Sequence, residues 1–349
     1  MEPLFGKTLS ELKNLAEKSG LPRYTGKQMA DWLYKKHTGS VAEMTNLSKR
    51  ARETLSEKYT IGLSSPVNVV VSSDGTKKYL FKTPSGHYVE AAYIPEKKRH
   101  TLCISSQMGC KMGCLFCMTG KQGFQGNLST NEILNQIVSI PEKNLLTNIV
   151  YMGMGEPMDN PEAVMSGIEI LTSEWGFAMS PRRITLSTIG LLPAMKTYMD
   201  RSDCHLAISL HSPFDKERKQ LMPIQSVYPV EEVIRFVKSY DWQGQRRISF
   251  EYILFKGLND TPVHVKELAR LLNGLRCRIN LIHFHEIPET PLRAASLQEM
   301  EDFRDQLKQK GIFTTIRRSR GQDIDAACGL LSTKKLLEEN VEKPKPLSL

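Results

Sequence analysis

Apolar and polar residues follow two different rhythms along the chain from about residue 100 onward. Short apolar runs that suit strands lie in the segments TLCISS, NIVYMGMG, RRITLSTIG, CHLAISLHS, RRISFEYILF, RINLIHFHE and FTTIRRS. Helical spacing marks the segments between them, STNEILNQIVSI, PEAVMSGIEILTS, LLPAMKTYM, PVEEVIRFVKSY, PVHVKELARLLN and SLQEMEDFRDQLKQKG. Strands that alternate with helices in this way predict an α/β fold with a parallel sheet, wound open or curled into a barrel.

The first 95 residues carry other patterns, which predict two smaller units before the main domain. Residues 1–62 show helical spacing and are rich in Lys and Arg, which suits either solvated helix faces or an accessory domain that binds RNA backbone. Residues 63–95 alternate around Asp74–Gly75, which predicts a β-hairpin and a further strand. This β extension leads into the main domain, residues 96–335, and residues 336–349 form a charged tail that we expect to be flexible.

Composition narrows the class of protein. Hydrophobic residues make up 40% and charged residues 24% of the 349 positions, as is ordinary for a globular protein. No apolar run approaches the roughly 18 residues of a membrane span, and the N-terminus has no apolar signal segment. We therefore expect a cytoplasmic protein, with no membrane partner and with reduced cysteines. The net charge of +9 favours a polyanionic partner such as nucleic acid, although it does not require one.

Three cysteines stand close together in the segment GCKMGCLFC. Cys110, Cys114 and Cys117 have the spacing C-x3-C-x2-C, directly after the predicted strand TLCISS. A structural zinc site needs four ligands, and an electron-transfer [4Fe–4S] cluster takes four cysteines. Three cysteines on one loop would leave one iron of a cluster open to a substrate or cofactor. Three incidental core cysteines are the ordinary alternative, but the loop lies where parallel α/β folds gather their active sites.

The triplet after the first strand of a repeated βα domain resembles the radical S-adenosylmethionine superfamily. That resemblance implies a partial (βα)6 barrel, one [4Fe–4S] cluster on Cys110, Cys114 and Cys117, and S-adenosylmethionine on the open iron. Four more segments resemble the RlmN/Cfr family of RNA adenine methyltransferases and favour its RlmN branch: YMGMGEPMDN, RRITLSTIGLLP, AISLHSP and DIDAACGLL. The similarity covers nearly the whole chain, including the helical N-terminal domain.

The RlmN resemblance implies a reaction and its partners. Members of that branch methylate C2 of an adenine in 23S rRNA, acting before the ribosome is fully assembled. Many also methylate C2 of the adenine 3′ of the anticodon in tRNA. Each turnover uses two molecules of S-adenosyl-L-methionine and an electron donor such as flavodoxin. The chemistry is consistent with a radical route, because C2 lies between two ring nitrogens and is too electron-poor to attack a methyl sulfonium.

The resemblance also assigns catalytic roles to three residues. Cys328 matches the cysteine that carries the methyl group and then links the enzyme to RNA, because a thiolate readily attacks a sulfonium methyl. Cys103 matches the resolving cysteine, whose attack on Cys328 leaves a disulfide bond. Glu90 matches the general base that removes the C2 proton, and a carboxylate between Val89 and Ala91 is costly to bury without a role. The ordinary alternative for both cysteines is packing in a core.

Contacts to S-adenosylmethionine can be carried over onto matching segments. They are Gly155, Glu156, Ser187, Ser209, Leu210, His211 and His285. His285 stands where relatives commonly have Asn, and Asn280 is the alternative. The basic cluster Arg317, Arg318 and Arg320 suits either a solvated strand end or RNA phosphates. Cys204 and Cys277 match no motif, so we interpret both as structural.

Three other functions compete with adenine-C2 methylation. A C8 methyltransferase of the Cfr type shares the triplet, the carrier and the resolving cysteine. A methylthiotransferase would carry a second cysteine triplet, which the sequence lacks. A non-enzymatic nucleic-acid-binding module with a structural metal would be a colourless zinc protein.

Overall fold

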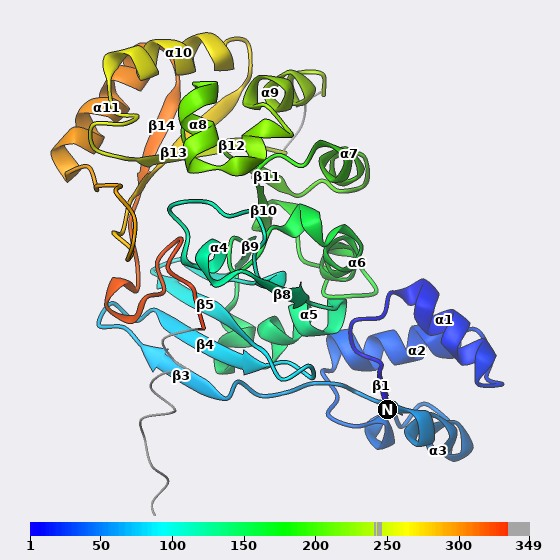
Figure 1. Ribbon diagram of the computed structural model, residues 1–349. Coiled ribbons are helices and arrows are strands. Elements are labelled where there is room, and N and C mark those ends of the chain that lie inside the picture. The colour runs from blue at the N-terminus through cyan, green and yellow to red at the C-terminus, as the bar shows by residue number, and fades with distance from the viewer. Residues whose placement is uncertain (241, 243–245, 334–349) are drawn as a thin grey trace, which may run out of the picture.

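The computed structural model describes residues 1–240, 242 and 246–333, so the expected tail at residues 336–349 lies outside the described residues. One ten-stranded sheet runs through the molecule in the order β14-β13-β12-β11-β10-β9-β6-β5-β4-β3. Seven strands of this sheet are parallel: β6 Arg99–Cys103, β9 Asn148–Tyr151, β10 Ile184–Thr188, β11 His205–Ser209, β12 Ile248–Leu254, β13 Cys277–His283 and β14 Phe313–Arg317. This arrangement confirms the predicted α/β class with a mostly parallel sheet (Figure 1).

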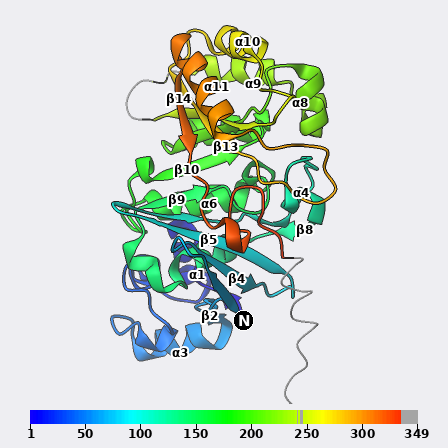
Figure 2. The same cartoon turned by 90° about the vertical axis from the view of Figure 1, so that its left-hand side faces the viewer.

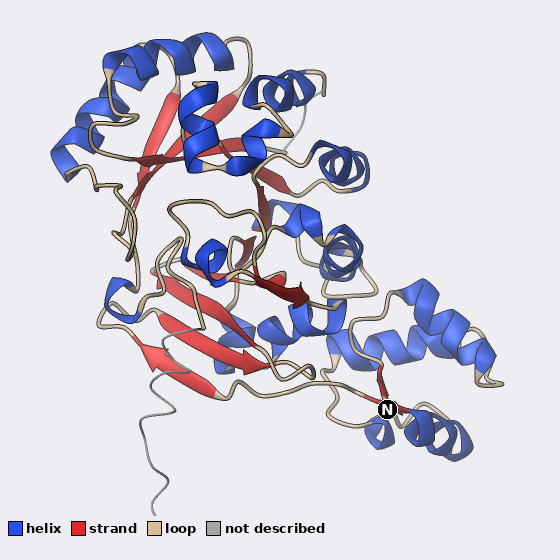
Figure 3. Cartoon of the chain, viewed as in Figure 1, coloured by secondary structure: helices blue, strands red, loops and turns tan. Residues whose placement is uncertain are grey.

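The predicted helices connect consecutive parallel strands. They are α5 Thr130–Val138, α6 Pro161–Thr172, α7 Leu192–Arg201, α9 Val230–Lys238, α10 Pro262–Leu272 and α11 Leu297–Gln309. Because the parallel strands follow chain order, right-handed crossovers place successive helices on the same face of the sheet. Figure 3 shows the blue helices outside the red strands, as in a curled, singly wound sheet.

Local sequence signals fix where several helices begin. Capping boxes, in which the cap and third-residue side chains bond each other's backbone amides, start α5 at Ser129 and α11 at Ser296. Proline is the first residue of α6 and of α10, where its missing N–H has no helical partner in any case. These signals explain why the predicted boundaries of the helices lie close to the observed ones.

Residues 63–95 extend the sheet with antiparallel strands. They form β3 Asn68–Val71, β4 Lys77–Lys82 and β5 Tyr88–Glu96, and β5 pairs antiparallel with β6. The turn between β3 and β4 contains Gly75, whose φ of +84° suits glycine. The predicted hairpin is therefore present, and its strands continue the same sheet that carries the parallel strands.

The N-terminal helices pack beside α5 and α6 (Figure 1). They are α1 Leu9–Lys18, α2 Thr25–Ala30, a π-helical turn over Asp31–Lys35, a 3-10 turn over Val41–Glu43 and α3 Lys49–Lys58, with the short pair β1 Glu2–Pro3 and β2 Tyr59–Thr60. Asn131 of α5 donates hydrogen bonds to the carbonyls of Phe5 and Gly62, at 3.1 and 2.9 Å. One apolar core runs from these helices into the sheet domain.

Four short elements frame the active-site loops. They are β7 Gln107–Gly109, which pairs with β8 Phe124–Asn127, and the helices α4 Met118–Gln122 and α8 Asp215–Leu221. The sequence pattern did not predict them, because each is too short to show a period. Within the part of the chain that the structure describes, no helix combines the length and the apolar character that a membrane crossing needs.

Candidate active site

A cavity of about 720 Å³ lies inside the curled sheet. Alternate residues of the parallel strands line it, as the two-residue period of a strand requires. On β12, for example, Ser249, Glu251 and Ile253 face the cavity, whereas Phe250 and Tyr252 are buried in the outer core. The residues at the carboxyl ends of the strands, the triplet loop and the C-terminal loop complete its wall.

The three cysteines of the triplet all line this cavity. Their loop closes tightly at Gly109, where an added Cβ would lie 1.7 Å from the carbonyl oxygen of Gly123, so only glycine fits. Burial raises the pKa of the Cys110 thiol to about 12 and that of Cys114 well above its usual range. Neighbouring thiols raise both further, so ligation has to displace protons from thiols that resist ionisation.

The triplet fits a multi-iron cluster better than a single ion. Among residues 1–240, 242 and 246–333, no three His, Cys, Asp or Glu side chains converge closely enough to hold one metal ion. A [4Fe–4S] cluster does not need such convergence, because each cysteine binds a different iron. Cys110, Cys114 and Cys117 would hold the cluster, and the buried cation of Arg218 favours the thiolate form of Cys114.

Replacing any one cysteine of the triplet by alanine is expected to remove the cluster. Two remaining thiolates leave two irons without a protein ligand, so the purified variant should lose most of its bound iron and its charge-transfer absorption. Iron and absorption measured on anaerobically purified Cys110→Ala, Cys114→Ala and Cys117→Ala protein would show this. Cys277→Ala is the matched control, and a full cluster in all three variants would contradict the assignment.

Gly155 and Glu156 lie in the loop after β9. Gly155 has φ of +94°, and a Cβ there would come within 2.5 Å of Gln107, so the close approach to β7 requires glycine. The buried Glu156 carboxylate accepts hydrogen bonds from the amides of Met158 and Ile189, each at 3.0 Å. Burial nevertheless raises the pKa of Glu156 to about 7. Its carboxylate thereby joins the loops that follow β9 and β10.

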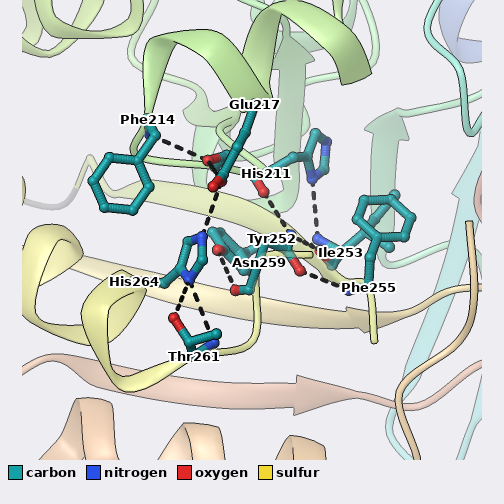
Figure 4. Close-up of polar contacts among 10 residues, drawn as sticks. His211, Phe214, Glu217, Tyr252, Ile253, Phe255, Asn259, Thr261 and His264 are labelled. Carbon is teal, nitrogen blue, oxygen red and sulfur yellow. Dashed lines mark hydrogen bonds and ion pairs between the residues drawn. The ribbon is translucent and has the colours of Figure 1, made fainter. Parts of the chain in front are cut away.

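His211 is buried just after β11 and lines the cavity (Figure 4). Its Nδ1 accepts a hydrogen bond from the amide of Ile253 at 3.0 Å, which leaves the proton of the neutral ring on Nε2. Burial lowers the pKa of His211 to about 3, so the ring stays neutral at physiological pH. Phe116, beside Cys117, packs edge-on against it with ring centroids 4.7 Å apart. His211 therefore contacts the triplet loop.

Asn259 holds the backbone around His211. Its side-chain amide donates to the carbonyls of His211 and Ile253, and its carbonyl accepts from the amide of Phe255, at 2.6 to 2.8 Å. Figure 4 also shows His264 bridging Glu217 and Thr261 nearby. These bonds fix the strained backbone of His211, whose φ is +56°.

Ser187 and Ser209 line the cavity from β10 and β11, but Leu210 does not. The Leu210 side chain is fully buried in the main core, and only its backbone faces the loops. Arg218 of α8, also fully buried, donates to the carbonyls of Ile189, Ser209 and Leu210 at 2.9 to 3.1 Å and to the Gln225 side chain. This arginine therefore ties the ends of β10 and β11 together.

His285 and Asn280, the two alternatives for one cofactor contact, both line the cavity. The Asn280 amide is already bonded at both ends, to Glu251 at 2.7 Å and to Thr315 at 2.8 Å. His285 bonds Ser319 through Nε2 at 2.8 Å. Asn280 would have to give up a protein bond to bind a ligand, so the geometry favours His285.

Cys328 lines the cavity from the C-terminal loop, residues 318–333. This loop is bonded to α4, directly after the triplet. The Met118 amide donates to the Gly329 carbonyl at 2.8 Å, and the Thr119 hydroxyl donates to the Leu331 carbonyl at 2.7 Å. Figure 2 shows the red C-terminal segment running beside β5. Cys328 is thus held against the triplet loop despite more than 200 residues of separation.

The same loop is clasped to the β3–β4 hairpin by two aspartates. Asp323 accepts from the Ser72 hydroxyl at 2.6 Å and from the Ser73 amide at 3.0 Å. Asp74 of the hairpin accepts in return from the Gly321 amide at 3.0 Å. These bonds connect the chain after β14, one edge of the sheet, with the hairpin at the other edge.

Cys103 and Cys328 share one end of the cavity with Arg317. Burial raises the pKa of Cys103 to about 12, and the nearby Cys328 thiol raises it further. The positive charge of Arg317 opposes that effect, because it is close enough to both thiols to interact with them electrostatically. The same guanidinium lies 3.9 Å from a Glu251 oxygen. Both cysteines are free thiols in this structure.

Glu90 lies behind the C-terminal loop and does not line the cavity. Its carboxylate is completely buried, 3.3 Å from the Lys78 ammonium, and accepts a hydrogen bond from the Ser332 amide at 2.9 Å. Burial raises the pKa of Glu90 to about 7, although Lys78 lowers it. The residue thus touches the loop that carries Cys328 but is separated from the open part of the site.

The remaining predicted residues fall into two groups, those that line the cavity and those that do not. Arg317, Arg318 and Arg320 all line the cavity, but Arg317 is directed at the thiols and Arg320 lies 3.9 Å from Asp74. Cys204 and Cys277 do not line it, which agrees with a structural role.

Two family models match the chain. One describes the radical SAM superfamily and matches residues 104–272, and the other describes the ribosomal RNA large subunit methyltransferase N-terminal domain and matches residues 3–61. A Bacteroides fragilis protein, "Probable dual-specificity RNA methyltransferase RlmN", is 53% identical over 97% of this chain and 98% of its own length. The chain belongs to the RlmN family of radical S-adenosylmethionine RNA methyltransferases. Membership confirms the resemblance on which the sequence prediction rested.

More distant RlmN relatives agree with this. "Dual-specificity RNA methyltransferase RlmN" of a Nitratiruptor species is 42% identical over 90% of this chain and 94% of its own length. A crystal structure of a radical SAM methyltransferase from Sphaerobacter thermophilus is 39% identical, covers 96% of this chain and 100% of its own, and superposes with a TM-score of 0.88. Superfamily membership implies the [4Fe–4S] cluster and S-adenosylmethionine.

Sequence reasoning missed several residues in and around the cavity. Arg218, which supports the cavity without lining it, has the appearance of a solvated helix residue in DKERKQL, and nothing local marks it as buried. Other missed residues had a visible signal, because arginine stands within one residue of the start of four parallel strands: Arg99 at β6, Arg183 at β10, Arg247 at β12 and Arg278 at β13. Counting back by two from the inward residues of each strand would have placed these side chains in the cavity.

Proposed function

We propose that the protein methylates C2 of an adenine in 23S rRNA and C2 of the adenine 3′ of the anticodon in tRNA, with Cys328 as methyl carrier. The observation that supports this best is the placement of Cys328 in one cavity with Cys103 and the cluster triplet. Relatives named for dual specificity support the two RNA substrates. When bound, the cluster and S-adenosylmethionine supply the hydrogen-abstracting radical, and a second S-adenosylmethionine supplies the methyl group.

The residues of this chain then have separate tasks. Cys328 sulfur holds the methyl carbon and, after that carbon joins C2, tethers the base to the enzyme. Glu90 accepts the C2 proton, and a pKa of about 7 suits a base at neutral pH. Because the Ser332 amide covers Glu90, this step requires the loop to shift at Ser332. Cys103 attacks Cys328 sulfur, the sulfur–carbon bond breaks, and a Cys103–Cys328 disulfide remains for a cellular thiol to reduce.

The cysteine arrangement does not distinguish C2 from C8, so product analysis is the test. Adenosines from 23S rRNA and tRNA would be analysed by mass spectrometry from a deletion strain with and without the gene. We expect 2-methyladenosine to disappear on deletion and to return with the gene, but not with a Cys328→Ala gene. A peptide of the purified protein that contains Cys328 should carry one methyl group. The appearance of 8-methyladenosine instead would assign the Cfr-type reaction and overturn the C2 proposal.

The partners follow from the same resemblance. The N-terminal domain, residues 1–62, would contact RNA beside the catalytic domain, and a flavodoxin-like donor would reduce the cluster in the cytoplasm. The surplus of Lys and Arg in residues 1–62 supports contact with a phosphate backbone.

A further inference from the structure

The cavity has two ends of different character. At the carboxyl ends of the parallel strands it is closed by the triplet loop and by the C-terminal loop, which bond each other through Met118 and Gly329. At the amino ends, the first inward-facing residues are arginines on four strands and a histidine on β11. We call this set the N-terminal mouth: Arg99, Arg182, Arg183, His205, Arg247 and Arg278.

Strand register places these residues around one rim. Arg278 of β13 lies opposite Ser249 of β12, two residues after Arg247. His205 of β11 lies opposite Thr185 of β10, two residues after Arg183. Basic residues on these neighbouring strands therefore differ in height by no more than two residues. Arg99, Arg182, Arg183 and Arg247 are exposed to solvent, whereas Arg278 is half-buried. The strand period therefore places arginines at the opening on or just before β6, β10, β12 and β13. His205 between them stays neutral, because burial and the neighbouring arginines lower its pKa to about 4.

The charges of the N-terminal mouth are not neutralised by ion pairs in the described part of the chain. The cavity arginines that form ion pairs there, Arg317 and Arg320, lie at the other end. Burial is the main cause that lowers the pKa of Arg99, and the charges of Arg317, Arg183 and Arg278 lower it further. Burial and the charge of Arg247 lower the pKa of Arg278 in the same way. Glu96 and Glu251 act in the opposite direction without pairing with these arginines. Such mutual repulsion is relieved when an anion binds.

The width of the N-terminal mouth fits a chain of phosphates. Arg183, just before β10, and Arg278 on β13 begin three strand spacings apart, each of about 4.8 Å, or roughly 14 Å along the curled sheet. Arginines spread over such an arc offer separate contacts to successive phosphates of one chain. A base that leaves its stack turns about its backbone, so its flanking phosphates stay at the entrance while the base goes in.

Resting on the proposed function, we propose that RNA enters by the N-terminal mouth, whose arginines bind the phosphates that flank the target adenine. The base then passes along the cavity toward Cys328, while the cluster and S-adenosylmethionine occupy the closed end. The contacts are sequence-independent, because phosphates carry no base identity. Base recognition is left to the residues deeper in the cavity.

The test measures RNA affinity of the cluster-loaded protein across a salt series. The probes are two labelled RNA hairpins that differ only in having an unpaired adenine or an unpaired uridine in the loop. In Arg247→Gln/Arg278→Gln, the slope of log affinity against log salt should fall by about 1 for each arginine, equally for both hairpins. Affinity should fall about tenfold or more. Arg247→Lys/Arg278→Lys keeps the charge and should keep the slope.

A matched control removes two charges at the closed end. Lys216 and Lys219 are exposed on α8, which follows the carboxyl end of β11. Lys216→Gln/Lys219→Gln should bind RNA like the unaltered protein, and a loss confined to this pair would overturn the proposal. So would an unchanged slope in the arginine variant. Iron content and the urea unfolding midpoint of each variant show whether it has folded. If the double arginine variant misfolds, Arg183→Gln alone tests the same change in salt slope. Absence of methyl on Cys328 in the unaltered protein would instead refute the proposed function.

Discussion

Cys103→Ala enzyme is expected to stall after one cycle, with RNA covalently attached through Cys328. The variant keeps the triplet and the carrier, so it should load the cluster and methylate Cys328. Without Cys103, no described thiol other than those of the triplet shares the cavity with Cys328, and nothing breaks the sulfur–carbon bond. The measurement is a denaturing gel of protein purified from cells, before and after ribonuclease. A slow, ribonuclease-sensitive band should appear, and 2-methyladenosine should be lost.

Two further variants make this result decisive. Adding Cys328→Ala should abolish the band, because the tether itself is gone. Cys277→Ala is the matched control: its thiol also lies on a strand and burial also raises its pKa to about 12, but it does not line the cavity. If Cys103 only packed the core, its loss would cost about 1–3 kcal/mol of stability and leave turnover intact. Normal release of methylated RNA by Cys103→Ala would establish that simpler role.

The second large effect is expected from Arg218→Met, which should lower the free energy of unfolding by about 3–5 kcal/mol, because several buried acceptors lose their donor at once. Methionine fills a similar volume but leaves the carbonyls of Ile189, Ser209 and Leu210 without their buried donor. Urea unfolding should show a lower midpoint at unchanged slope. Arg218→Lys should also be destabilised, since one ammonium cannot reproduce the planar fork that reaches several acceptors.

The same substitution should reduce iron retention. The Leu115 amide of the triplet loop donates to the Leu221 carbonyl at the end of α8 at 2.9 Å, so loosening α8 loosens the loop. Arg235→Met is a suitable control, because Arg235 is exposed on α9 and its loss should change stability by no more than about 0.5 kcal/mol. A fully stable Arg218→Met protein with normal iron would show that these carbonyls are satisfied without the arginine.

Much of the fold could be predicted because periods of two and of three to four residues persist over whole elements. The parallel strands and six crossover helices were all visible, and capping residues such as Ser129 and Ser296 marked helix starts. Short elements escaped: α4 has five residues and β7 has three, which is too few to show a period. Their positions depend on the triplet loop and on β8, which are tertiary constraints.

A residue of the candidate site was predictable only where its type and its neighbours in the sequence indicated the same environment. Apolar neighbours indicated that Glu90 is buried, but its partner Lys78 follows from the register of β4 against β5, which no local pattern encodes. Leu210 shows the limit of carrying over a motif, because its segment is correctly placed while its side chain belongs to the core. Arg218 shows the opposite case: its segment is polar and predicts exposure, but the loops that it joins bury its side chain.

The clasp between the C-terminal loop and the β3–β4 hairpin affects the order in which parts of the site assemble during synthesis. Its bonds join residues 247 to 251 positions apart, so the loop that closes when they form contains most of the chain. Contacts of such long range are among the slowest to form, because a large loss of chain entropy precedes them. The hairpin leaves the ribosome about 250 residues before the loop that bonds it, so the triplet loop can fold in the meantime. Cys328 can therefore reach its place only after the C-terminal loop has been made, so its thiol joins the cavity later than Cys103 and the triplet.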